Sequence, residues 1–219
     1  MCKLKIKNKL NTYFYVFDSI RTVLKKNNAL IKQNNTALSV LYFGLCNHLY
    51  ACMDAYVTLF EKENYYMCKT VDRILLDLYI KTRMLSMADD PEDLAKKIMD
   101  GDKIKKADLS RIYGQTKGIL VDTDLCHKFD EIDDGYAINQ PVDAKYGHRV
   151  GVLESRYRED CKYVHPNIPC VWSYTTDKQN DWRVIIEEDA SSFVDLAQKI
   201  NMFLSEVLKK IVSQQRGLK

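Results

Sequence analysis

The sequence predicts an all-α protein with a small accessory β-hairpin near residues 170–187. Its 219 residues include only 8 glycines and 4 prolines, the residues that most often interrupt helices. Long segments carry apolar residues three and four positions apart, which is the period of an amphipathic helix. One late segment instead gathers β-branched and aromatic residues around a polar turn. With 46% hydrophobic residues and no internal repeat, we expect residues 1–219 to form a single domain.

Helical spacing begins near the N-terminus and predicts a first helix within residues 1–30, peripheral to the rest of the domain. A second helix is expected over about 36–61, after asparagine and threonine cap residues, and a third over about 65–88. Apolar residues occur on several sides of the third helix across 71–80. We therefore expect its middle to be buried on nearly all sides.

A fourth, short helix has the clearest local signals. Asp90 is a cap residue, and Pro91 suits the first helical position. The carboxylates of Glu92 and Asp93 favour the positive end of the helix dipole. Gly101 is expected to end this helix.

The second half of the chain mixes helices with less regular segments. A helix is expected over about 106–120, followed by an acidic loop across 122–145 that lacks the spacing of a calcium-binding loop. The next helix is predicted over 146–165, and the hairpin near residues 170–187 follows it. A last amphipathic helix begins at Asp189.

Composition limits the class of protein. The formal net charge of +3 permits contact with polyanions but does not require it. No apolar run reaches the roughly 18 to 20 residues that span a bilayer, and there is no signal-peptide core, so we expect a soluble, cytoplasmic protein without membrane contact. The 7 cysteines lie mostly in apolar helical patterns, as is typical of a reducing compartment.

The sequence predicts no metal site and no cofactor. Two cysteine–histidine groupings lack a paired C-x-x-C and an obvious fourth ligand; they are Cys46, His48 and Cys52, and Cys161, His165 and Cys170. His127 is expected to pack or to lie at the surface. His148 is expected in the solvated first turn of the 146–165 helix.

The 146–165 helix offers the clearest candidate chemistry. Arg158 and His165 lie seven positions apart and so share one face, where a cation and a titratable base could act on a phosphate. Pro166 makes His165 the last helical residue or its cap. Simpler roles remain open. Glu154 is placed for an ordinary salt bridge with Arg158, and the role of His165 could be limited to a helix cap.

A second candidate is the pair Arg73 and Asp77, which lies inside an apolar stretch of the third helix. Charges in such a position are tolerated when they are paired or functional. The simpler interpretation is a buried structural ion pair between helices, and the alternative is an Asp77 that orients a catalytic arginine or histidine.

The helix order and two short motifs resemble the HEPN superfamily of helical nucleotide-binding and ribonuclease domains. The motifs are Arg73-Ile-Leu-Leu-Asp77 in the third helix and Tyr157-Arg158 to Tyr163-Val-His165-Pro166 in the late helix. The likeness covers roughly residues 30–215 and is nearest to an uncharacterised bacterial branch whose late helix ends in Val-His-Pro.

The resemblance implies a homodimeric, metal-independent endoribonuclease. In active members the catalytic motif is an arginine, four to six residues and a histidine, with an acidic residue from an earlier helix. The corresponding residues here are Arg158, His165 and Asp77. The substrate contacts expected beside them are Arg73, Lys162 and Tyr157. The implied reaction is attack of a ribose 2′-hydroxyl on the adjacent phosphorus.

One departure from the family pattern keeps a second interpretation open. Glu159 follows Arg158, where family members usually carry Asn, Asp or His. A catalytically silent module would bind a nucleotide, RNA or a protein partner without turnover. An active member would suit a toxin or phage-defence role, with an antitoxin as partner.

Overall fold

The computed structural model describes residues 35–133, 142–145, 147–164 and 179–217, with isolated positions between 18 and 29. Its helices are α2 (Ala37–Glu61), α3 (Tyr65–Met87), α4 (Pro91–Asp100), the 3-10 helix η1 (Lys106–Leu109), α5 (Ser110–Tyr113), α6 (Asp122–Asp133), α7 (Val152–Val164) and α9 (Gln179–Gly217). No strand occurs in these ranges, so the all-α prediction is confirmed for the described part of the chain. The helix predicted within 1–30 falls almost entirely outside it.

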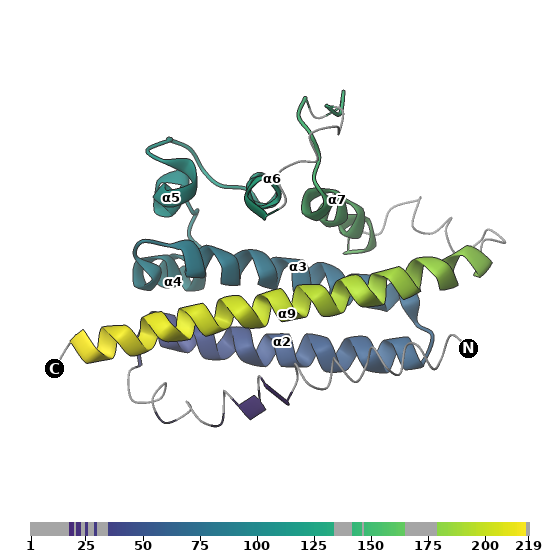
Figure 1. Cartoon of the computed structure of the whole chain (residues 1–219), viewed down its shortest axis with the longest axis horizontal. Coiled ribbons are helices and arrows are strands. Elements are labelled where there is room, and N and C mark those ends of the chain that lie inside the picture. The colour runs from purple at the N-terminus through teal and green to yellow at the C-terminus, as the bar shows by residue number, and fades with distance from the viewer. Residues whose placement is uncertain are drawn as a thin grey trace.

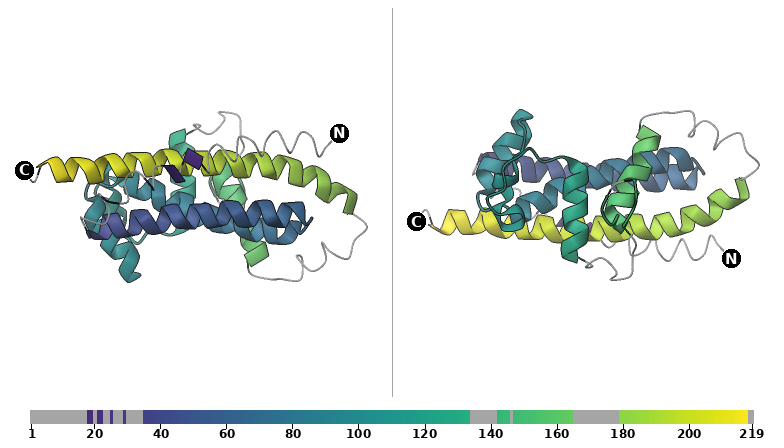
Figure 2. Two further views of the ribbon diagram at one scale, coloured as in Figure 1. Left: turned by 90° about the horizontal axis from the view of Figure 1, so that it is seen from below. Right: turned by 90° about the horizontal axis from the view of Figure 1, so that it is seen from above.

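The long helices α2, α3 and α9 lie side by side and form a body, and α6 and α7 lie across it as an outer layer (Figures 1 and 2). Helix α3 lies between α2 and this outer layer (Figure 1). Apolar side chains fill the body, as the helical spacing predicts; fully buried examples are Leu49, Leu75, Leu76 and Ile200. The rings of Tyr56 and Phe193 stack at 3.8 Å and join α2 to α9. Helix α3 is buried along most of its length because it has neighbours on both sides.

Helix α4 begins and ends at the residues that the sequence indicates. The Asp90 carboxylate accepts hydrogen bonds from the backbone N–H groups of Glu92 and Asp93. Gly101 ends the helix with φ of 71°, a left-handed conformation that glycine adopts without strain. The Glu92 carboxylate also accepts bonds of 3.0 Å from the N–H groups of Ala37 and Leu38. Helix α4 thus caps the start of α2.

The prediction of an acidic loop across 122–145 is partly wrong. Within 122–145, residues Asp122–Asp133 form α6. Leu125, Cys126 and Phe129 share a helical face and are buried, and this burial stabilises a segment whose acidic residues suggested a loop. The preceding helix is shorter than the predicted 106–120, since α5 ends at Tyr113 before a glycine with positive φ.

The prediction of a β-hairpin is wrong for its second strand. Its second half, residues 182–186, lies in α9, whereas residues 170–178 lie outside the described part of the chain. In the sequence, apolar residues at 182, 186, 193, 197, 200 and 204 continue one helical period. Strand propensity depends on context, and the helical period extends back through the aromatic and β-branched residues.

Candidate functional site at the contact of α3 and α7

Helix α7 packs across α3 through polar and aromatic side chains. Near the C-terminal end of α7, the Tyr66 hydroxyl donates a 3.0 Å hydrogen bond to the Tyr163 carbonyl. The two rings meet edge to face at 5.6 Å. Helix α7 begins at Val152 rather than near residue 146, so His148 precedes it and does not lie in its first turn. The expected catalytic His165 lies directly after the described end of α7, outside the described residues.

Arg73 is the centre of this contact. Its guanidinium lies over the Tyr157 ring, 3.8 Å from the ring centre, and pairs with Asp77 one turn along α3. The Arg73 Nε–H also donates to the Cys161 Sγ at 3.3 Å. Burial lowers the pKa of Arg73, but the bonds to Asp77 and Cys161 outweigh this effect and raise the pKa above its ordinary value.

The Arg73–Asp77 pair is therefore structural in part, although it is not sealed from solvent. The Arg73 side chain is 11% exposed, and that of Asp77 is 38% exposed. Both residues lie on α3, so the pair does not join two helices as expected. Its carboxylate end reaches the surface, where it can contact a ligand.

Tyr157 holds α7 against two other helices. It is 8% exposed, and its hydroxyl donates a 2.8 Å hydrogen bond to Asp122 on α6. Burial and the neighbouring Asp122 carboxylate raise the pKa of Tyr157, so the phenol stays protonated. The expected substrate contact of Tyr157 can thus involve little of its ring.

Arg158 belongs to a separate group of residues. Its Nε and Nη2 atoms donate to the Glu154 Oε1 at 2.9 and 2.7 Å. The sequence predicts this pair as an ordinary surface salt bridge, but the Glu154 side chain is 0% exposed and that of Arg158 is 31% exposed. A buried carboxylate needs its partners far more than an exposed one does. Glu154 therefore positions the Arg158 guanidinium.

Two histidines share the same carboxylate. The Nε2 atom of His148 lies 3.0 Å from the Glu154 Oε2, and the Nδ1 atom of His127 lies 3.4 Å from it. Both histidines are partly exposed, and the sequence does not indicate their shared contact with Glu154. Their positions 21 residues apart gave no local signal, because α6 and the turn before α7 bring them together only in the fold.

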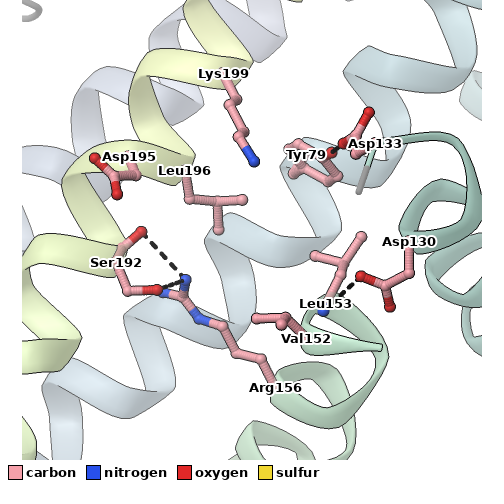
Figure 3. Close-up of a pocket in the computed structure, with 10 residues that line it drawn as sticks. All are labelled: Tyr79, Asp130, Asp133, Val152, Leu153, Arg156, Ser192, Asp195, Leu196 and Lys199. Carbon is pink, nitrogen blue, oxygen red and sulfur yellow. Dashed lines mark hydrogen bonds between the residues drawn. The ribbon is translucent and has the colours of Figure 1, made fainter. Parts of the chain in front are cut away.

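A buried charge cluster on the other side of α7 was also not predicted. The Arg156 Nε–H donates 2.9 Å to an oxygen of Asp72 on α3, and Arg156 also binds Ser192 on α9 (Figure 3). Asp160, one turn along α7, is 0% exposed, with Lys69 Nζ 3.7 Å away. Burial and the nearby Asp72 carboxylate raise the pKa of Asp160 from 3.8 to about 8. The four-residue spacing of Arg156 and Asp160 is the signal that could have found it.

A cavity of about 200 Å³ opens beside Arg156, between α7, α9 and α3 (Figure 3). Lys199 and Asp195 on α9 contribute to its wall, together with Tyr79 on α3. Ligand pockets for drug-sized molecules occupy about 300 to 1,000 Å³. The cavity is smaller than this range.

Of the expected site residues, the fold brings Arg73, Asp77 and Tyr157 together. Arg158 lies on the same helix as Tyr157 but binds Glu154. The side chain of Lys162 lies outside the described part of the structure.

Comparisons of the chain with family models, with curated proteins and with solved structures find no match. The assignment to the HEPN superfamily thus stays a prediction from the two motifs. Among the described helices, none combines the length and the apolar character that a membrane crossing requires.

Proposed function

We propose that this protein is a HEPN-like, metal-independent endoribonuclease that acts as a homodimeric toxin or phage-defence effector. The observation that supports the proposal is the packing of α3, which carries Arg73 and Asp77, against α7, which carries Arg158. The resemblance requires an acidic residue from an earlier helix near the late helix. The two corresponding helices, α3 with Asp77 and α7 with Arg158, are in contact.

In the proposed reaction His165 accepts the proton of a ribose 2′-hydroxyl. The O2′ atom then attacks the adjacent phosphorus, the bond to the 5′-oxygen breaks, and that leaving oxygen takes up a proton from a water molecule. The products are a 2′,3′-cyclic phosphate and a free 5′-hydroxyl. Arg158 stabilises the negative charge that develops on the phosphoryl oxygens. Asp77 orients either Arg158 or His165.

Glu154 is a positioning residue in this scheme. A guanidinium held at Nε and Nη2 by one buried oxygen loses few degrees of freedom when it meets a phosphate. The 31% exposure of the Arg158 side chain keeps it within reach of RNA.

The pairing of Arg158 with Glu154 favours one alternative, a catalytically silent module that binds a nucleotide, RNA or a protein partner. Glu154 neutralises Arg158, and Glu159 adds a further carboxylate where the family pattern has another residue. The negative charge that develops on the phosphoryl oxygens during cleavage then meets less positive charge, which disfavours turnover. Tight binding without turnover is the expected behaviour of this module.

Digestion of labelled total RNA in excess chelator tests the proposal. The parent protein is expected to cleave RNA, while Arg158→Ala and His165→Ala lose at least about 100-fold in rate, as general acid–base and electrostatic contributions require. The products are expected to carry cyclic phosphate ends.

Two matched variants serve as controls for lost charge and lost imidazole. Arg111→Ala removes an exposed guanidinium on α5, and His48→Ala removes an exposed imidazole on α2. Both are expected to cleave at the parent rate. Equal cleavage by all five proteins would remove the assignment, and RNA binding without cleavage by the parent would favour the silent module.

A further inference from the structure

The strongest unassigned group of side chains lies where α6, the turn before α7 and α7 meet. His127 on α6, His148 in the turn and Glu154 on α7 each offer one donor atom, and the three atoms lie within 4.8 Å of one another. The two imidazole rings are 4.4 Å apart between centres and inclined at 65°. Two imidazoles and one carboxylate converge on a single point.

We propose that His127, His148 and Glu154 bind one divalent transition metal ion of the zinc type. The donor atoms are His127 Nδ1, His148 Nε2 and Glu154 Oε2. This site goes beyond the proposed nuclease reaction, which uses no metal, and it joins the outer layer to the segment that precedes α7.

The distances between donor atoms suit a tetrahedral ion. Zinc binds nitrogen and oxygen at about 2.0 to 2.2 Å, which places neighbouring tetrahedral donors about 3.3 Å apart. Glu154 Oε2 lies 3.0 Å from His148 Nε2 and 3.4 Å from His127 Nδ1. Two of the three distances between donor atoms thus lie within a few tenths of an ångström of the tetrahedral value, and the third, between the two imidazole nitrogens, is at most 4.8 Å. Magnesium and calcium prefer oxygen donors, so two imidazoles favour zinc over them.

Surrounding residues hold each donor in place. Glu131 Oε1 lies 3.5 Å from the second ring nitrogen, Nε2, of His127, an arrangement that directs Nδ1 toward the ion. Arg158 binds Glu154 Oε1, which also lies 3.1 Å from His148 Nε2, whereas Oε2 lies near both imidazoles. The backbone bond from Asp143 N–H to the His148 carbonyl, 3.0 Å long, closes the turn that carries His148.

The start of α7 is fixed in the same way, which places Glu154 accurately. The Asp130 carboxylate accepts 2.9 Å hydrogen bonds from the N–H groups of Leu153 and Glu154 (Figure 3 shows the bond to Leu153). A Cβ atom at Gly151 would lie 2.2 Å from Asp130 Cγ, so only glycine allows this approach.

Access and charge also suit an ion. The side chains of His127 and His148 are 27% and 35% exposed, whereas that of Glu154 is 0% exposed. An ion can enter between the imidazoles and meet a buried charge at the bottom. With three protein donors, a fourth position remains for water or another ligand.

Zinc titration of the full-length protein, first stripped with chelator, tests the site. Calorimetry is expected to give one zinc ion per chain, with binding weakened at least about 100-fold in His127→Ala and in His148→Ala, and about 10-fold in Glu131→Gln. His48→Ala, on α2, is expected to bind zinc like the parent. Both site histidines are partly exposed, so their variants are expected to keep the parent's circular dichroism.

Cobalt serves as a spectroscopic substitute for zinc. Bound Co²⁺ is expected to show the visible bands of a four-coordinate ion with nitrogen and oxygen donors, and these bands disappear in His148→Ala. The proposed site would be overturned if the parent showed no saturable zinc binding, or if zinc binding were unchanged in both histidine variants. Sulfur-to-cobalt charge-transfer bands would also overturn it, because they would place the ion on cysteine thiolates.

Discussion

The body of α2, α3 and α9 and the outer layer of α6 and α7 are held by different kinds of contact. In the body, apolar side chains such as Leu75 and Phe193 are 0% exposed and pack without directional bonds. The outer layer also contributes apolar side chains such as Phe129 to the core, but it binds α3 in addition through paired charges, among them Arg156 with Asp72 and Arg83 with Asp133. Apolar burial supplies most of the stability, whereas paired charges fix one position of the layer and leave polar groups available for chemistry.

The largest expected effect comes from breaking a buried pair at the contact between the two regions. Arg156→Met leaves Asp72 and Asp160 buried near each other with Lys69 as the remaining cation. Removing one partner of a buried pair costs about 3 to 5 kcal/mol, and we expect a loss of this size in the free energy of unfolding. Denaturant titration measures it. A loss below about 1 kcal/mol would mean that the cluster is solvated like a surface pair.

The pH dependence of stability distinguishes the two regions. The pKa of Asp160 is raised from 3.8 to about 8, so between these values the folded state holds a proton that the unfolded state has lost. The free energy of unfolding should therefore fall as pH rises through this window, by at most about 1.4 kcal/mol per pH unit. Asp160→Asn, which stays neutral, should remove this decline and be the more stable protein at the upper end.

A variant of the body provides the control for that prediction. Leu75→Ala removes a fully buried side chain and is expected to cost about 3 kcal/mol at every pH. Denaturant titrations of the parent and both variants across the window make the comparison. If Asp160→Asn shows the parent's pH profile, Asp160 is ionised in the folded protein and the account of the cluster is wrong.

The smallest expected effect concerns the cap of α4, a short helix that packs against α2 of the body. Asp90→Ala removes the side-chain cap of α4 and should lower the free energy of unfolding by about 1 kcal/mol. Asp90→Asn keeps an acceptor at the cap and should cost less. A melting temperature of Asp90→Ala equal to that of the parent would show that the cap does not stabilise α4.

Local signals in the sequence predicted part of the structure. The boundaries of α4 follow from Asp90, Pro91 and Gly101, which act within one or two turns of the chain. The i, i+4 pair of Glu154 and Arg158 was equally local and is present, but its burial was not foreseen because α6 covers it.

Residues that depend on distant partners were beyond local reasoning. Asp130 lies in the segment that the sequence predicts as an acidic loop, yet it is 6% exposed and caps α7. His127 and His148 meet at Glu154 only because that cap fixes the start of α7. Arg156 precedes the Tyr157-Arg158 motif and forms an ionic contact between α7 and α3 that no local pattern predicts.

The central claim is that the functional face of the molecule is the outer layer and the part of α3 that it covers. Hydrogen exchange with a 2′-O-methyl RNA, which cannot be cleaved because it lacks the attacking hydroxyl, tests this claim directly. We predict slower exchange in α7 and in the half of α3 that carries Arg73 and Asp77, with α2 and α4 unchanged. Slower exchange confined to α2 or α4, or no change anywhere at saturating RNA, would contradict it.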